Sequence, residues 1–137
     1  MLRPETKARA RALQVLYSME VSGDLSLADA VSRMARLTGP DPRVYDHAEE
    51  LAHLVLEERD ELDRHAADAA DNWRLDRIAA VERNILRIGI HELLRGAIPP
   101  KVAIDEAVQL AHWFGGAKAP AFVNGVLDRV AHSLGRL

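Results

Sequence analysis

Positively charged residues are concentrated at the start of the chain. The first eleven residues hold four cations and one carboxylate: Arg3, Lys7, Arg9, Arg11 and Glu5. This end therefore carries a charge of +3, whereas the whole chain has a formal net charge of -3, so the remaining residues carry -6. A basic end on an acidic protein predicts one local anionic partner, not general adsorption to polyanions.

Helical spacing arranges most of these cations in a row. At 100° per residue, one stripe about 80° wide contains Arg3, Lys7, Arg11, Gln14 and Ser18. Leu13 and Leu16 lie on the opposite side, and Tyr17 lies at the border. Such a row suits a phosphate backbone, because each long side chain can reach a different phosphate. Arg9 projects near the apolar side, so it must leave the end of the bundle, pair with a carboxylate or reach a ligand.

A second interpretation of the row remains open. Its cations could form a solvated face that pairs with the acidic remainder of the chain, and such surface pairs contribute little. Cations at a helix N-terminus, however, oppose the helix dipole at a cost of about 0.3–1 kcal/mol each. This cost favours a functional reason for the row.

Residues capable of catalysis or metal binding form no recognisable constellation. The chain has no cysteine, which excludes disulfides, zinc–thiolate sites and thiol nucleophiles. His65 and Asp68 could touch one metal ion, but a third ligand is missing, so no metal site is predicted. The glycine-rich stretch 115–118 lacks the spacing of a phosphate-binding loop. We therefore expect no enzyme activity, no metal and no cofactor.

Hydropathy predicts a soluble, cytoplasmic protein. No apolar run approaches the roughly 20 residues that span a membrane. The first ten residues, MLRPETKARA, contain no apolar signal-peptide core.

Apolar spacing predicts an all-α protein of about seven helices. The expected helices cover about 4–20, 26–36, 42–56, 63–70, 77–95, 101–114 and 120–134. Ser26 and Asp41 are expected N-caps, and Gly96 and Gly115 are expected stop signals. The broad apolar stripe of 77–95 predicts the central helix of the core. The break near 38–42 could separate a smaller N-terminal group of helices from a larger C-terminal one.

Three segments resemble one known family. They are ARARALQVLY at 8–17, VERNILRIGIHEL at 81–93 and PPKVAIDEAVQLAHWFGG with AFVNGVLDRV at 99–130. Together, in this order and over nearly the whole chain, they are similar to the NusB transcription antitermination family. The resemblance implies an all-helical protein of two packed helical bundles. We expect one RNA-binding domain over 1–137, with sub-bundles of about 1–70 and 71–137.

The resemblance also implies a function and partners. Proteins of this family are not enzymes; they bind the single-stranded boxA element of nascent transcripts, including ribosomal RNA leaders. They do so with NusE, a protein of the small ribosomal subunit, and the pair joins an RNA polymerase antitermination complex. Carried over by position, the RNA-binding candidates are Arg3, Lys7, Arg9, Arg11, Gln14, Tyr17, Lys118 and Phe122. Glu82 corresponds to a partner-binding glutamate, with an exposed helix charge as the alternative.

Two departures from the family concern RNA affinity and a helix cap. Glu5-Thr6-Lys7 stands where the family often has three arginines, so RNA affinity is expected to be modest and the partner more necessary. Ala119 replaces a serine- or threonine-type cap, so the last helix must rely on Pro120 and backbone geometry. Phe122 could offer a stacking face to a base, or it could simply pack in the core.

Two rival functions keep the same fold. A NusB-like domain also begins some ribosomal RNA cytosine methyltransferases, but this chain lacks the cysteine nucleophile of that chemistry. The alternative is a protein-interaction module, or a homodimer formed through the first helix, that binds no RNA of its own. Salt dependence separates RNA binding from this interaction-module alternative, because binding at an RNA site weakens steeply with salt and association through an apolar interface does not.

Overall fold

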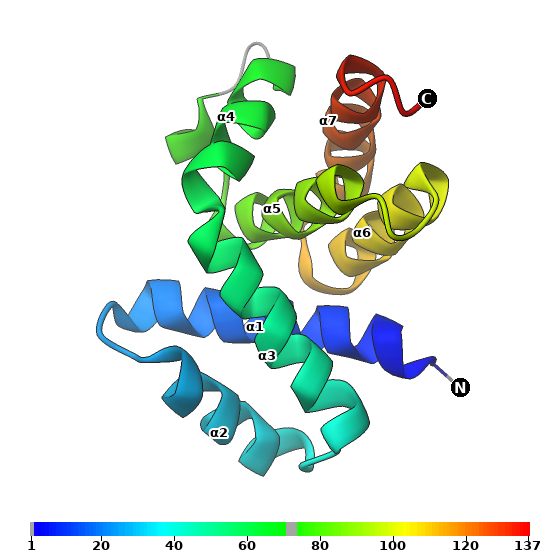
Figure 1. Ribbon diagram of the computed structural model, residues 1–137. Coiled ribbons are helices and arrows are strands. Elements are labelled where there is room, and N and C mark those ends of the chain that lie inside the picture. Colours follow the sequence, from blue (N-terminus) through cyan, green and yellow to red (C-terminus); the bar gives the residue numbers. More distant parts are fainter. Residues whose placement is uncertain (1, 71–73) are drawn as a thin grey trace. The chain divides into compact units, whose positions relative to one another are not determined.

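The protein is all-helical, as expected. The computed structural model describes residues 2–70 and 74–137. Within these ranges it contains seven α-helices and one short 3₁₀ helix, and no strand (Figure 1). In chain order the elements are α1 (Pro4–Ser22), α2 (Leu27–Thr38), α3 (Pro42–Glu57), α4 (Arg59–Ala69), η1 (Leu75–Arg77), α5 (Ala80–Arg95), α6 (Pro100–Phe114) and α7 (Ala119–Ser133). The expected connection at 71–73 lies outside the described residues.

The helices form two compact units, Met1–Glu57 and Glu58–Leu137. The expected boundary near residue 70 differs from this division, because α4 packs on α5 and α7. Leu62 explains the difference: it is the large side chain of α4 that becomes fully buried. The earlier break near 38–42 is a turn between α2 and α3 inside the N-terminal unit.

In the N-terminal unit, α1 packs on both α3 and α2. Ser26 caps α2 as expected, since its hydroxyl accepts a hydrogen bond from the Asp29 N–H at 3.1 Å. Asp41 likewise caps α3, with its Oδ1 accepting from the Arg43 N–H at 3.0 Å. These caps satisfy backbone donors that the first helical turns leave without partners.

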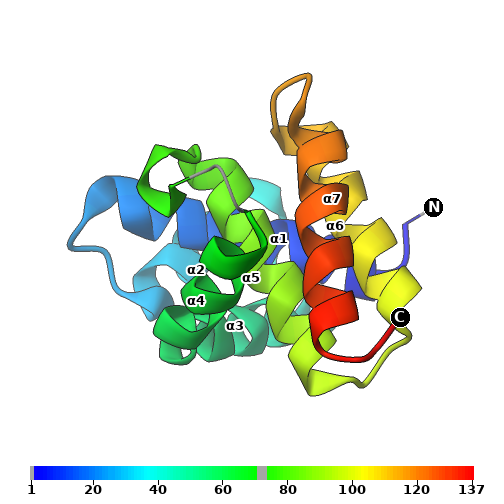
Figure 2. The same cartoon turned by 90° about the horizontal axis from the view of Figure 1, so that it is seen from above.

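In the C-terminal unit, α5 is the central helix, as its broad apolar stripe predicted. Every residue from 84 to 91 is buried, and α5 contacts α4, α6 and α7. Figures 1 and 2 both show α6 and α7 side by side next to α5. Gly89 permits the close approach, because a Cβ there would lie 2.7 Å from a Leu127 methyl and 3.4 Å from the Ala107 Cβ.

Two polar pairs join α4 and the residue before it to α5. The Arg87 guanidinium donates from Nε to Asp63 Oδ1 at 2.7 Å and from Nη2 to Oδ2 at 3.0 Å. The His91 ring Nδ1 lies 2.8 Å from Glu58 Oε1. Arg87 and His91 are buried, and these carboxylates help to make their burial tolerable.

The last expected helices begin and end close to their predicted positions, but α5 starts three residues later than expected. Arg77 ends η1, and Ile78 is extended with φ -79° and ψ 133°.

No helix in the described ranges is long and apolar enough to cross a membrane.

Candidate nucleic-acid interface

The basic row predicted on the first helix lies on α1. Arg3 and Lys7 are exposed, whereas Arg11 and Gln14 are half-buried. The Arg11 guanidinium donates from Nη1 to Gln14 Oε1 at 2.7 Å, which holds the two side chains together. The row is therefore a real surface feature of the helix, and its binding of RNA stays a prediction.

The other sides of α1 are largely buried. The buried residues are Thr6, Ala8, Ala10, Ala12, Leu13, Val15 and Leu16. Because small alanines let neighbouring helices approach closely, the helix axis is held by packing and the row is presented on a rigid support. Arg9 is half-buried on the side away from the row, and Tyr17 is 41% exposed.

The Asp41 carboxylate, close to the row, is hydrogen-bonded to the Arg43 side chain. The hydrogen bond from the Arg43 side chain holds the pKa of the Asp41 carboxyl below its ordinary value of 3.8, and the charge of Lys7 is the smallest of the contributions that lower it. Arg43 Nη2 lies 3.0 Å from Asp41 Oδ2. Lys7 therefore lies close enough to the start of α3 for its charge to lower the pKa of Asp41.

The pKa of Asp41 provides a test of this arrangement. Arg43→Ala is expected to raise this pKa toward 3.8, and Lys7→Gln to raise it by less, because each removes a contribution that lowers it. A lowered folded-state pKa stabilises the fold above 3.8, and this contribution is lost as pH falls through the folded value. An NMR titration of the Asp41 carboxyl carbon measures both shifts. An unchanged pKa in Lys7→Gln would contradict the proximity of Lys7.

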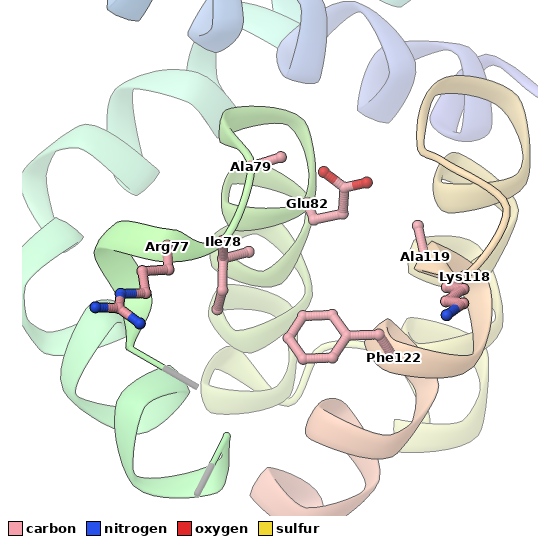
Figure 3. Close-up of a pocket in the computed structure, with 7 residues that line it drawn as sticks. All are labelled: Arg77, Ile78, Ala79, Glu82, Lys118, Ala119 and Phe122. Atoms are coloured by element: carbon pink, nitrogen blue, oxygen red, sulfur yellow. The ribbon is translucent and has the colours of Figure 1, made fainter. Parts of the chain in front are cut away.

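The remaining candidates line one pocket in the C-terminal unit. This pocket of about 230 Å³ is lined by Arg77, Ile78, Ala79, Glu82, Lys118, Ala119 and Phe122. Figure 3 shows the Phe122 ring projecting from α7 toward Ile78, with Lys118 on the α7 side and Arg77 on the other. An aromatic ring between two cations can hold a flat group on the ring and an anion at the rim.

The N-terminus of α7 has the backbone geometry expected for its sequence. Lys118 is the N-cap residue and makes no capping hydrogen bond with its side chain, and a proline occupies the first turn. The Ala119 N–H donates to the Gly116 carbonyl at 3.0 Å, and the Phe122 N–H to the Lys118 carbonyl at 3.2 Å. Lys118 is exposed and Phe122 half-buried, so Phe122 is not simply a core residue.

Glu82 lies in the same pocket instead of projecting freely from α5. It is half-buried in the first turn of α5, and its Oε1 accepts a hydrogen bond from the Gly116 N–H at 3.2 Å. Glu82 is therefore a half-buried charge bonded to the loop, not a freely projecting one. Its partner-binding role stays a prediction.

The structure places the candidate residues in two groups. Arg3, Lys7, Arg9, Arg11, Gln14 and Tyr17 belong to the N-terminal unit; Glu82, Lys118 and Phe122 belong to the C-terminal unit. Sequence reasoning missed Arg77, Ile78 and Ala79, because it began the helix at residue 77 and so placed them on a helix face. In the described ranges, no three potential metal ligands lie together.

Solved structures define the class of this fold. T. maritima NusB has a TM-score of 0.85 and 30% identity, covering 96% of this chain and 93% of that one. A NusB chain crystallised with NusE and double-stranded RNA also has a TM-score of 0.85, at 27% identity, covering 97% of this chain and 99% of that one. The fold is therefore that of the NusB-type all-helical proteins.

Sequence comparison shows the family directly. Residues 6–132 match the NusB family profile. The transcription antitermination protein NusB of Anaeromyxobacter dehalogenans (strain 2CP-1 / ATCC BAA-258) is 44% identical over 135 residues, or 98% of this chain and 94% of that protein. That of Bacillus subtilis (strain 168) is 41% identical, covering 90% of this chain and 91% of the relative. The chain belongs to the NusB family, and the resemblance inferred from its sequence is confirmed.

Proposed function

We propose that this chain is a transcription antitermination factor that binds boxA-type single-stranded RNA in nascent ribosomal transcripts together with the ribosomal protein NusE. Its relatives in two bacterial genera are transcription antitermination proteins, at 44% and 41% identity. A similar NusB chain was crystallised with NusE and double-stranded RNA. In this role the two units act as one RNA-binding domain within a cytoplasmic RNA polymerase complex.

The observation that carries the proposal is the basic row on α1. Arg3, Lys7 and Arg11 are presented along one side of a helix whose remaining sides are largely buried. The chain as a whole is negatively charged, so this row supplies a localised attraction for phosphates. Arg9, Gln14 and Tyr17 lie on the same helix and provide further RNA contacts in this proposal.

The pocket in the C-terminal unit supports a second RNA contact. Phe122 can stack on an unpaired base, an interaction that contributes about 1–3 kcal/mol per base. Lys118 can hold the adjacent phosphate. Glu82, in the first turn of α5, is the candidate contact for NusE.

Fluorescence anisotropy with a short boxA-type RNA tests the proposal, with and without NusE. The Lys7→Ala/Arg9→Ala/Arg11→Ala variant is expected to bind at least tenfold more weakly. Its plot of log affinity against log salt should be shallower by about 2, because each phosphate contact on a single strand contributes about 0.7. Lys7→Ala/Arg11→Ala spares the half-buried Arg9 and should also weaken RNA binding and flatten the salt dependence. Circular dichroism checks that this double variant is folded.

A charge-matched variant serves as the control. Arg33→Ala/Arg36→Ala/Arg64→Ala removes three exposed cations outside α1 and should leave most of the affinity and the salt slope in place. Equal losses in both triple variants would mean that net charge, not the α1 row, drives binding. Wild-type protein that binds no RNA with or without NusE, yet forms a salt-insensitive homodimer, would favour the interaction-module alternative.

A further inference from the structure

The loop between α6 and α7 contains one residue of the pocket and leads into the helix turn that contains another. It covers residues 115–118, so it ends at Lys118, and Phe122 follows in the first turn of α7. The N-cap side chain makes no capping bond, and exposed Gly116 and Ala117 bury no side chain in the core. The position of Lys118 beside Phe122 therefore depends on what holds the loop.

A carboxylate from α5 holds this loop. Glu82 Oε1 accepts a hydrogen bond from the Gly116 N–H at 3.2 Å, across 34 positions of the chain. The bond needs only an oxygen acceptor at this position, which a carboxylate or an amide side chain can supply. In Figure 3 the Glu82 carboxylate lies between the start of α5 and the start of α7.

The neighbouring glycine makes room for this contact. A Cβ at Gly115 would lie 3.2 Å from Glu82 Oε1 and 2.6 Å from the Ala119 Cβ. The loop backbone is thus seated directly against the carboxylate and the start of α7. Two adjacent residues of the loop, Gly115 and Gly116, are adapted to the same side chain.

The charge of Glu82 is unfavourable for the proposed ligand. Among the described residues that line the pocket, Glu82 is the one carboxylate, and RNA is an anion. A negative charge beside a phosphate lowers affinity, since like charges repel. Its hydrogen bond to the loop is the compensating contribution visible in the structure.

We propose that Glu82 is a positioning residue for RNA binding: its carboxylate fixes the α6–α7 loop so that Lys118 and Phe122 are presented together at the pocket. This inference rests on the proposed function. It gives Glu82 a role in the isolated protein, before any ribosomal partner is bound.

Two substitutions separate this role from simple charge repulsion. Glu82→Gln keeps an oxygen acceptor for the Gly116 N–H and removes the charge, whereas Glu82→Ala removes both. The positioning role predicts that Glu82→Gln binds boxA-type RNA as tightly as wild type or more tightly. Glu82→Ala should bind about fivefold more weakly than Glu82→Gln, the effect of losing one net hydrogen bond. Repulsion alone predicts that both variants bind more tightly by the same factor.

The RNA measurement is made by anisotropy without NusE, with Asp105→Ala as the control. Asp105 is an exposed carboxylate on α6 and does not line the pocket, so its loss reports the effect of net charge alone. Hydrogen exchange of the Gly116 amide, followed by NMR, provides the second readout. Exchange should accelerate in Glu82→Ala and stay near the wild-type rate in Glu82→Gln.

The outcomes distinguish this proposal from the proposed function. Absence of RNA binding by the wild type would overturn the proposed function and the RNA role of Glu82 with it. Wild-type binding with equal affinities for Glu82→Gln and Glu82→Ala would overturn the positioning role alone. So would a Gly116 amide that exchanges at the same rate in both variants.

Discussion

Replacing Asp63 with alanine is expected to lower the free energy of unfolding of the C-terminal unit by about 3 kcal/mol. The Arg87 side chain is 10% exposed, and Asp63 at 23% exposure supplies two of its hydrogen bonds. Removing one partner of a buried pair takes away much of the compensation for the other charge, which typically costs about 3–5 kcal/mol. The lower end applies, because Arg87 Nη1 still donates to Asn84 Oδ1 at 3.2 Å. Urea unfolding followed by circular dichroism measures the change.

Two further variants show whether loss of the compensating carboxylate is the cause. Asp68→Ala removes an exposed carboxylate from the same helix and should change stability by less than about 0.5 kcal/mol. Asp63→Leu/Arg87→Met replaces the pair with apolar side chains and should recover most of the loss. A double variant no more stable than Asp63→Ala would show that the pair matters for packing and not for charge compensation.

Gly115→Ala is expected to destabilise the same unit by about 1–3 kcal/mol, the usual cost of forcing extra atoms into a packed site. The backbone at Gly115, φ -91° and ψ 177°, is open to any residue, so the cost is steric. A Cβ would lie 2.6 Å from the Ala119 Cβ and 2.9 Å from the Ala111 carbonyl oxygen. Both belong to helices that end or begin at this loop, so neither can move away alone.

Gly116→Ala is the matched control for this steric argument. A Cβ at Gly116 meets no atom within 4 Å, and its N–H to Glu82 is retained. This change should therefore be neutral or should stabilise by up to about 1 kcal/mol, because alanine restricts the unfolded chain. Thermal unfolding of the two variants side by side measures the contrast. Equal melting temperatures would mean that the loop relaxes around Gly115 at little cost.

Local sequence signals were sufficient for most of the helices. Side-chain capping at Ser26 and the stop at Gly96 depend on neighbouring residues only, and the structure has both, with Gly96 in the left-handed region at φ 72°. The apolar stripe of α5 also predicted its central position, because a helix with a broad apolar face must be covered on several sides. The basic row needed only the helical period to be recognised.

The start of α5 and the division of the chain were decided by tertiary contacts. Ile78 continues the apolar period of α5, yet it is extended and buried before the helix begins. The division at 57/58 follows from Leu62 and from the pairing of Asp63 with Arg87, 24 positions apart. Periodicity carries no information about which distant helix a face will meet.

Local pattern thus determined the helices, the α1 row and the family, because each depends on residues a few positions apart or on the order of motifs along the chain. Tertiary structure alone decided the pocket, because Arg77 and Phe122 are far apart in sequence and line one pocket only when α5 packs on α7. Tertiary structure also decided the hydrogen bonding and partial burial of Glu82. From sequence this residue is a charge on a helix, whereas folding places its carboxylate on the Gly116 amide, where hydrogen bonding offsets its partial burial.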